Sequence, residues 1–101
     1  MPINVHLKEG VDDTGDLGSV IAVGLPWGVI EDHREEFPLM RGIDPYSDTY
    51  FGELQMRDLL VELERLMPLV DLAVASQLGD ILTLARSGST RPHHYLVFKG
   101  D

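Results

Sequence analysis

Two apolar stripes with helical spacing follow one another in the second half of the chain and limit the fold more than any other feature. In residues 53–67, and again in residues 69–86, apolar side chains recur every three or four positions, as on one face of a helix. Pro68 separates the stripes, because proline ends one helix or opens the next. We therefore expect two successive helices. Their stripes consist of Met56, Leu59, Leu60, Leu63 and Met67, then of Val70, Val74, Leu78, Ile81, Leu82 and Ala85.

The second of these helices is the more apolar one. Asp71 and Asp80 are its only acidic residues, so we expect it to be the more buried helix or to offer an interface to a second copy of the chain. Gly79 in its interior costs about 1 kcal/mol relative to alanine, which predicts close packing against another backbone. The Ser-Gly-Ser sequence of residues 87–89 is the expected end of the helix.

Alternation of polar and apolar residues predicts a strand at the N-terminus. Over residues 3–8 the side chains alternate with the period of a half-buried strand, which puts His6 on the solvent face. Residues 10–18 are dense in turn formers, and residues 19–23 are rich in β-branched side chains. We therefore expect a hairpin with a loop of several residues.

Residues 93–98 predict a final strand. Both of its alternating faces carry apolar side chains, as expected for an interior strand, and we expect it to pair with the N-terminal strand. The predicted fold is therefore α+β, a small antiparallel sheet of about three strands packed on two antiparallel helices. We expect residues 1–101 to form a single domain, because the sequence shows no linker or repeat and is 44% apolar.

The charge balance disfavours several classes of partner. Eight basic residues against seventeen acidic ones give a net charge of −9, which disfavours nucleic acids and anionic membranes. The acidity either serves a basic protein partner or only confers solubility. The chain has no cysteine, and its N-terminus lacks the features of a signal peptide. Acidic residues also interrupt its longest apolar run. We expect a cytoplasmic protein.

The stretch before the first predicted helix, residues 43–52, concentrates the candidate binding residues. Pro45 restrains the backbone, and the neighbouring Asp, Ser and Thr side chains can bond to it, so we expect a rigid loop. The loop is either a turn and helix cap whose aromatic rings pack on the core, or a binding surface. The candidate contact residues are Asp44, Tyr46, Asp48 and Tyr50.

Two further features could take part in binding. Trp27 follows the second predicted strand and is either a lid on the core or an exposed anchor. Residues 31–36 form a charged run with four acids, which predicts a solvated short helix or loop.

Parts of the sequence resemble a known group of proteins. Phe37-Pro38-Leu39, the segment Ile43-Asp44-Pro45-Tyr46-Ser47-Asp48-Thr49-x-Phe51-x-x-Leu54-Gln55-Met56, and Phe98-x-Gly100-Asp101 are similar to a set of small uncharacterised actinobacterial proteins. Their usual form is Asp-Pro-Tyr-Gly-Asp-Thr, so Ser47 departs at one turn position. The resemblance implies a bacterial protein, and it does not indicate any particular activity, cofactor or partner.

Motifs that would indicate catalysis or metal binding are weak or missing. Asp13-Thr14-Gly15 has the triplet of aspartic proteases but does not follow an apolar strand, so we interpret it as a turn. Asp12, Thr14 and Asp16 have calcium-loop spacing, but the required glycine and glutamate are missing. We therefore assign no catalytic, cofactor or metal residue. The four histidines, of which His6 could approach His93 or His94, leave a metal site as an alternative.

Three functional hypotheses follow. The first is a non-enzymatic protein-binding module that presents acidic and aromatic groups to a basic partner, of which an immunity protein against a basic toxin is one form. The second is a small enzyme or metal-dependent protein that uses histidine with Asp44 or Asp48. The third is a homo-oligomeric structural protein that buries its second helix.

Overall fold

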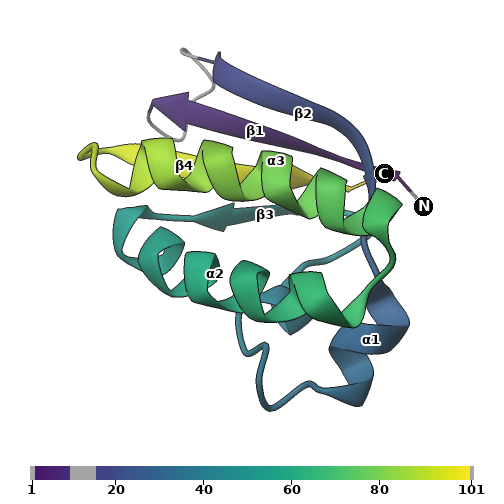
Figure 1. Cartoon of the computed structure of the whole chain (residues 1–101). Coiled ribbons are helices and arrows are strands. Elements are labelled where there is room, and N and C mark those ends of the chain that lie inside the picture. The colour runs from purple at the N-terminus through teal and green to yellow at the C-terminus, as the bar shows by residue number, and fades with distance from the viewer. Residues whose placement is uncertain (1, 10–15, 101) are drawn as a thin grey trace.

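The computed structural model describes residues 2–9 and 16–100, so the predicted turn at Asp13-Thr14-Gly15 and the calcium-like spacing that starts at Asp12 lie outside the described residues. The chain combines four strands with three α-helices and two short 3₁₀ helices among these residues, which confirms the α+β class (Figure 1). In order, the elements are β1 (Pro2–Glu9), β2 (Asp16–Gly24), α1 (Trp27–Asp32), η1 (Met40–Gly42), β3 (Asp48–Phe51), α2 (Glu53–Leu66), η2 (Met67–Leu69), α3 (Leu72–Ser89) and β4 (His94–Lys99).

The strands form one antiparallel sheet in the order β2-β1-β4-β3. The predicted pairing of the first and last strands is confirmed, and β4 is an interior strand between β1 and β3. The described part of the sheet has four strands rather than about three, because β3 lies within the stretch predicted as a loop. Four residues preceded by turn formers are too few to show a strand period in the sequence.

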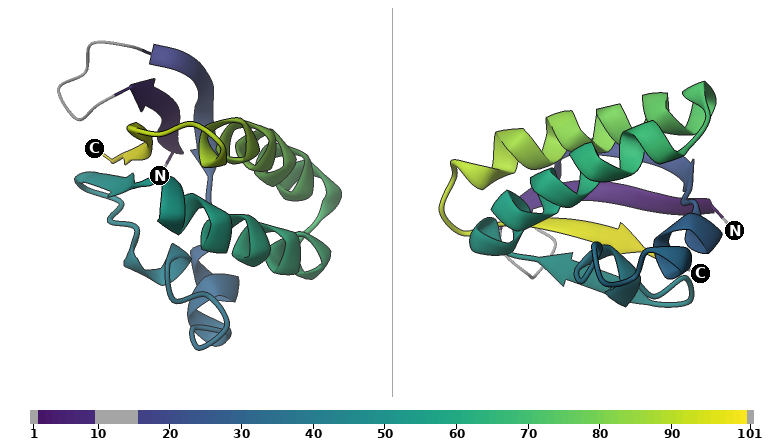
Figure 2. Two further views of the ribbon diagram at one scale, coloured as in Figure 1. Left: turned by 90° about the vertical axis from the view of Figure 1, so that its left-hand side faces the viewer. Right: turned by 60° about the horizontal axis from the view of Figure 1, so that its bottom comes forward.

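Helices α2 and α3 cover the same face of the sheet, as the views in Figure 2 show. The register pairs Val5 with Phe98 and Leu7 with Leu96, and all four side chains are buried. Most side chains of the two predicted helical stripes pack in the same core as these sheet residues. The fully buried ones are Met56, Leu59 and Leu63 from α2 and Leu78, Ile81 and Ala85 from α3. Burial of each large apolar side chain contributes about 1.5–3 kcal/mol to folding.

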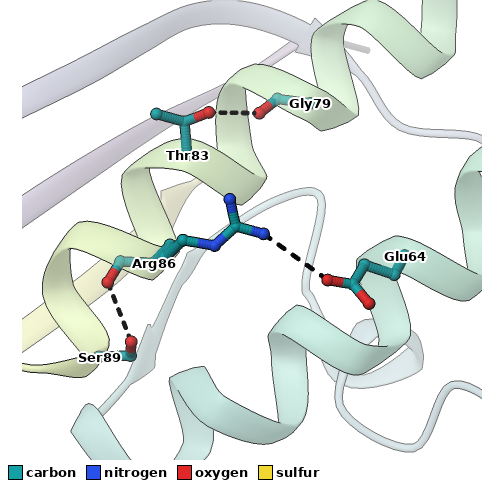
Figure 3. Close-up of polar contacts among 5 residues, drawn as sticks. All are labelled: Glu64, Gly79, Thr83, Arg86 and Ser89. Atoms are coloured by element: carbon teal, nitrogen blue, oxygen red, sulfur yellow. Dashed lines mark hydrogen bonds and ion pairs between the residues drawn. The ribbon is translucent and has the colours of Figure 1, made fainter.

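The second helix begins later than predicted. Its first residue is Leu72, because the Asp71 side chain caps the helix by accepting a 2.9 Å hydrogen bond from the Val74 amide. It ends at Ser89, three residues later than the predicted Arg86, and the Ser89 hydroxyl donates to the carbonyl of Arg86 (Figure 3). It is not the more buried helix, since five of its 18 residues are buried against five of 14 in α2.

An exposed ion pair joins the two long helices. The Arg86 guanidinium of α3 lies 3.7 Å from the Glu64 carboxylate of α2 (Figure 3). Both side chains are largely exposed, so the pair stabilises the helix contact by less than about 1 kcal/mol. The apolar stripes hold the helices together.

Gly88, rather than Gly79, is the glycine that close packing requires. A Cβ added at Gly79 would meet only the Met67 Cε atom, at 3.8 Å, so the expected close approach there is wrong. At Gly88 an added Cβ would lie 2.5 Å from Leu7 Cδ1 and 2.8 Å from Met56 Sδ. The C-terminal end of α3 therefore contacts both β1 and α2 at a site with no room for a side chain.

Within residues 2–9 and 16–100, no helix combines the length and the apolar character needed to cross a bilayer.

Candidate functional site

The turn before β3 is held by its own side chains. The Asp44 carboxylate accepts two hydrogen bonds of 2.8 Å, one from the Tyr46 amide and one from the Ser47 hydroxyl. The Asp44 amide in turn donates to Thr49 Oγ1 at 3.1 Å. The bond from the Tyr46 amide and then that from the Ser47 hydroxyl hold the pKa of Asp44 below its usual value. Asp44 thus orders the turn while remaining exposed.

The C-terminal end of the described chain closes on this turn. Gly100 donates its amide to the Ser47 carbonyl at 3.1 Å, and a Cβ added at Gly100 would lie 2.6 Å from the Pro45 carbonyl carbon and oxygen. Only glycine therefore fits against the turn. The turn and the segment that ends at Gly100, which are far apart in sequence, form one structural unit.

This unit leaves four of the candidate residues at the surface. Asp44 and Asp48 are exposed, Tyr46 is 68% exposed and Tyr50 is 38% exposed. Phe51 enters the core and packs edge-on against Phe98, and the Tyr50 ring packs edge-on against Tyr95. The structure thus brings two carboxylates and two phenol rings together on one ordered turn and the short strand that follows it.

Trp27 lies on a different element. It is the first residue of α1, is partly buried and packs against the hydrophobic core. The charged run beside it is exposed, with Glu31 and Asp32 ending α1 and residues 33–36 forming turns. Arg34 and Glu31 form an exposed pair at 3.5 Å.

The histidines are dispersed. The register places Glu9 opposite His94 and Val97 opposite His6, so strand pairing does not bring His6 to His94. His33 is exposed at the end of α1, and His93 precedes β4 with a left-handed φ of 64°. In the described part of the chain, no group of three or more His, Asp or Glu side chains is arranged to hold a metal.

One buried carboxylate was missed by the sequence analysis. Glu62 of α2 is 4% exposed and accepts hydrogen bonds from the amides of Leu39, at 3.1 Å, and Met40, at 2.9 Å. Burial raises its pKa, against the lowering effect of these bonds. The sequence did contain a signal for this burial, because Glu62 lies three residues after Leu59 and therefore on the apolar stripe of the helix. Because backbone donors occupy the carboxylate, Glu62 anchors η1 to α2.

No family model matches the chain, and no curated protein or solved structure matches it. We therefore infer function from the surface formed by Asp44, Tyr46, Asp48 and Tyr50, which we call the turn surface. Carboxylates accept charge-assisted hydrogen bonds from arginine and lysine, and phenol rings stack with guanidinium groups. The turn surface has the chemistry to recognise basic side chains.

Proposed function

We propose that this protein is a non-enzymatic protein-binding module whose turn surface recognises a basic protein. The observation that carries the proposal is that the turn is ordered by its own hydrogen bonds while its acidic and aromatic side chains remain exposed. Such a surface needs little ordering when a partner binds, which lowers the entropic cost of association.

The composition of the turn surface supports this class of function. Tyrosine is enriched among residues that dominate binding energy, and Tyr46 is among the most exposed large apolar side chains of the described chain. A net charge of −9 steers a basic partner toward the molecule and speeds its association. Trp27 at the start of α1 is proposed as a peripheral contact.

An immunity protein against a basic toxin is one form of this proposal, and it rests on analogy with the size and charge of such proteins. The cytoplasm is the proposed location, since a chain without cysteine needs no oxidising compartment.

The test compares partner capture by the wild type and by a variant that combines Asp44→Ala, Tyr46→Ala and Asp48→Ala. Each immobilised protein is incubated with a lysate of the source organism, and the captured proteins are quantified by mass spectrometry. We expect at least one basic protein to be captured by the wild type and to be reduced about tenfold or more with the variant, since interface anchors contribute about 2 kcal/mol or more.

A charge-matched control separates this surface from general acidity. A variant combining Leu54→Ala, Asp58→Ala and Asp80→Ala also removes two exposed acids and one large exposed side chain, all from the long helices. It should capture the basic protein as the wild type does. Equal capture by the wild type and the turn-surface variant, both folded by circular dichroism, would show that the turn surface is not the binding site.

A further inference from the structure

Among the residues that the structure describes, β3 is an edge strand with no strand paired on its outer side. The sheet order β2-β1-β4-β3 leaves β2 and β3 at the two margins, and Figure 1 shows β3 on the side away from β2. The pairing of β2 with β1 has two register irregularities, whereas β3 pairs with β4 in unbroken register over all four residues. Because bulges disfavour the addition of a strand, β3 is the better template.

The hydrogen bond between Gly100 and Ser47 fixes which groups of β3 point outward. It continues the ladder one pair beyond Asp48 and Lys99, so Ser47 and Gly100 are a hydrogen-bonded pair. Bonded and non-bonded pairs alternate in an antiparallel ladder. Asp48 and Tyr50 are therefore non-bonded positions, and their backbone N–H and C=O groups point away from β4.

These outward groups adjoin the turn surface. Among the described residues, no backbone hydrogen bond of a turn, loop or helix cap involves Asp48 or Tyr50, and both residues are exposed. Their side chains share one face of the sheet, opposite to the face that carries Phe51 and the long helices. Backbone donors and acceptors thus lie next to a carboxylate and a phenol.

We propose that the partner binds by adding an extended, arginine- or lysine-rich segment to β3 as an antiparallel strand. This inference rests on the proposed function and specifies how the same surface would be used. In an antiparallel addition, the residues opposite Asp48 and Tyr50 direct their amides at β3 and their side chains to the same face as these two residues. Basic side chains at those positions meet the carboxylate and the ring.

The net charge of −9 and the exposed Asp48 carboxylate favour a basic segment on the outer side. Lys99 lies directly opposite Asp48 on β4, so a cation already neighbours this carboxylate on its inner side. An added strand would place a second cation on its outer side. Strand addition thus combines up to four backbone hydrogen bonds with a charge pattern that selects the segment.

The test uses a defined peptide, since it does not require the natural partner. The probe is a capped decapeptide of alternating arginine and threonine, and its binding to the full chain is measured by calorimetry. Two further peptides carry N-methyl groups on either the arginine amides or the threonine amides. We expect arginine-amide methylation to weaken binding about tenfold or more, and threonine-amide methylation to have less than about a threefold effect.

A matched pair of protein variants tests the backbone hydrogen bond that the Tyr50 amide of β3 would donate to the added strand. Tyr50→Pro and Tyr50→Ala both remove the phenol, but only the proline removes the outward amide, and proline is tolerated on edge strands at such positions. Tyr50→Pro should bind the unmethylated peptide about five- to tenfold more weakly than Tyr50→Ala.

Several outcomes would overturn strand addition. Equal affinities for all three peptides would show that charge alone drives binding, in which case capture of a basic protein by the turn surface could still hold. Failure of the unmethylated peptide to bind at millimolar concentration would reject a basic strand. Dimerisation of the wild type in sedimentation, abolished by Tyr50→Pro, would assign the edge to a second copy instead. The peptide comparison remains decisive even if Tyr50→Pro does not fold.

Discussion

Gly100 packs against the carbonyl of Pro45 so closely that a single added carbon atom would lie 2.6 Å from it. The neighbour is backbone, so the turn or the end of the sheet has to move when Gly100 is replaced. We expect Gly100→Ala to lower the free energy of unfolding by about 1–3 kcal/mol in chemical denaturation.

The matched control is Gly28→Ala in α1, where an added Cβ meets nothing within 4 Å. This variant should be as stable as the wild type or slightly more stable, because alanine favours a helix. If both variants unfold at the same denaturant concentration, the contact between Gly100 and the turn does not contribute to stability.

The residues of the turn surface should differ in their contribution to stability. Tyr46 and Asp48 are exposed, so Tyr46→Ala and Asp48→Ala should each change the free energy of unfolding by no more than about 0.5 kcal/mol. Asp44→Ala removes the acceptor of two hydrogen bonds and should cost about 1 kcal/mol. A loss of about 2 kcal/mol for Tyr46→Ala would instead identify its ring as a structural clamp.

The buried carboxylate of Glu62 predicts a pH dependence of stability. Because its folded-state pKa is raised, the folded protein binds this proton more tightly than the unfolded chain does. The stability from Glu62 is therefore fully present below its unfolded pKa and is lost as the pH rises through its folded pKa. Denaturation of the wild type and Glu62→Gln between about pH 4 and pH 7 should show the wild type losing stability relative to the variant.

The reverse trend, with the wild type gaining relative to Glu62→Gln as the pH rises, would contradict the assigned direction. A second variant tests the anchoring role of this side chain. Glu62→Ala leaves the amides of Leu39 and Met40 without their acceptor, and at neutral pH it should cost about 1–3 kcal/mol.

The two glycines of α3 should respond in opposite directions to alanine. Gly88→Ala forces a Cβ onto Leu7 and Met56, and we expect a loss of about 1–3 kcal/mol. Gly79→Ala meets only the flexible end of Met67 at 3.8 Å and should gain up to about 1 kcal/mol from helix propensity. Thermal melts of the two variants, measured side by side, check the sign of each effect.

The elements that the sequence predicted well are those whose pattern repeats over many residues. The stripes that include Leu59 and Leu78 extend over three turns or more of helix. The alternation of Ile3, Val5 and Leu7 extends over most of β1, and all five of these side chains are buried as predicted. The wrong start of α3 has a local cause, because Pro68 forms η2 and Asp71 caps the helix.

The features that were missed depend on contacts between distant residues. Glu62 is buried because amides about twenty residues earlier in the chain bond to it, and Gly88 is required because β1 passes beside it. Lys8 is buried although alternation places it on the face away from the long helices. The turn surface was identified from its residue types. Its position beside a strand edge follows from the pairing of β3 with β4, and no local sequence pattern indicates that pairing.

The pairing of β1 with β4 has a consequence for the order in which the molecule is assembled. These strands are central neighbours in the sheet, yet Asn4 and its partner Lys99 are separated by nearly the whole described chain. On the ribosome, the hairpin of β1 and β2 and the segment of β3 are made well before β4, and they cannot join until β4 inserts between them. The sheet is therefore completed only after residues 94–99 have been made, and its central pairing requires the closure of a long loop, which disfavours fast folding.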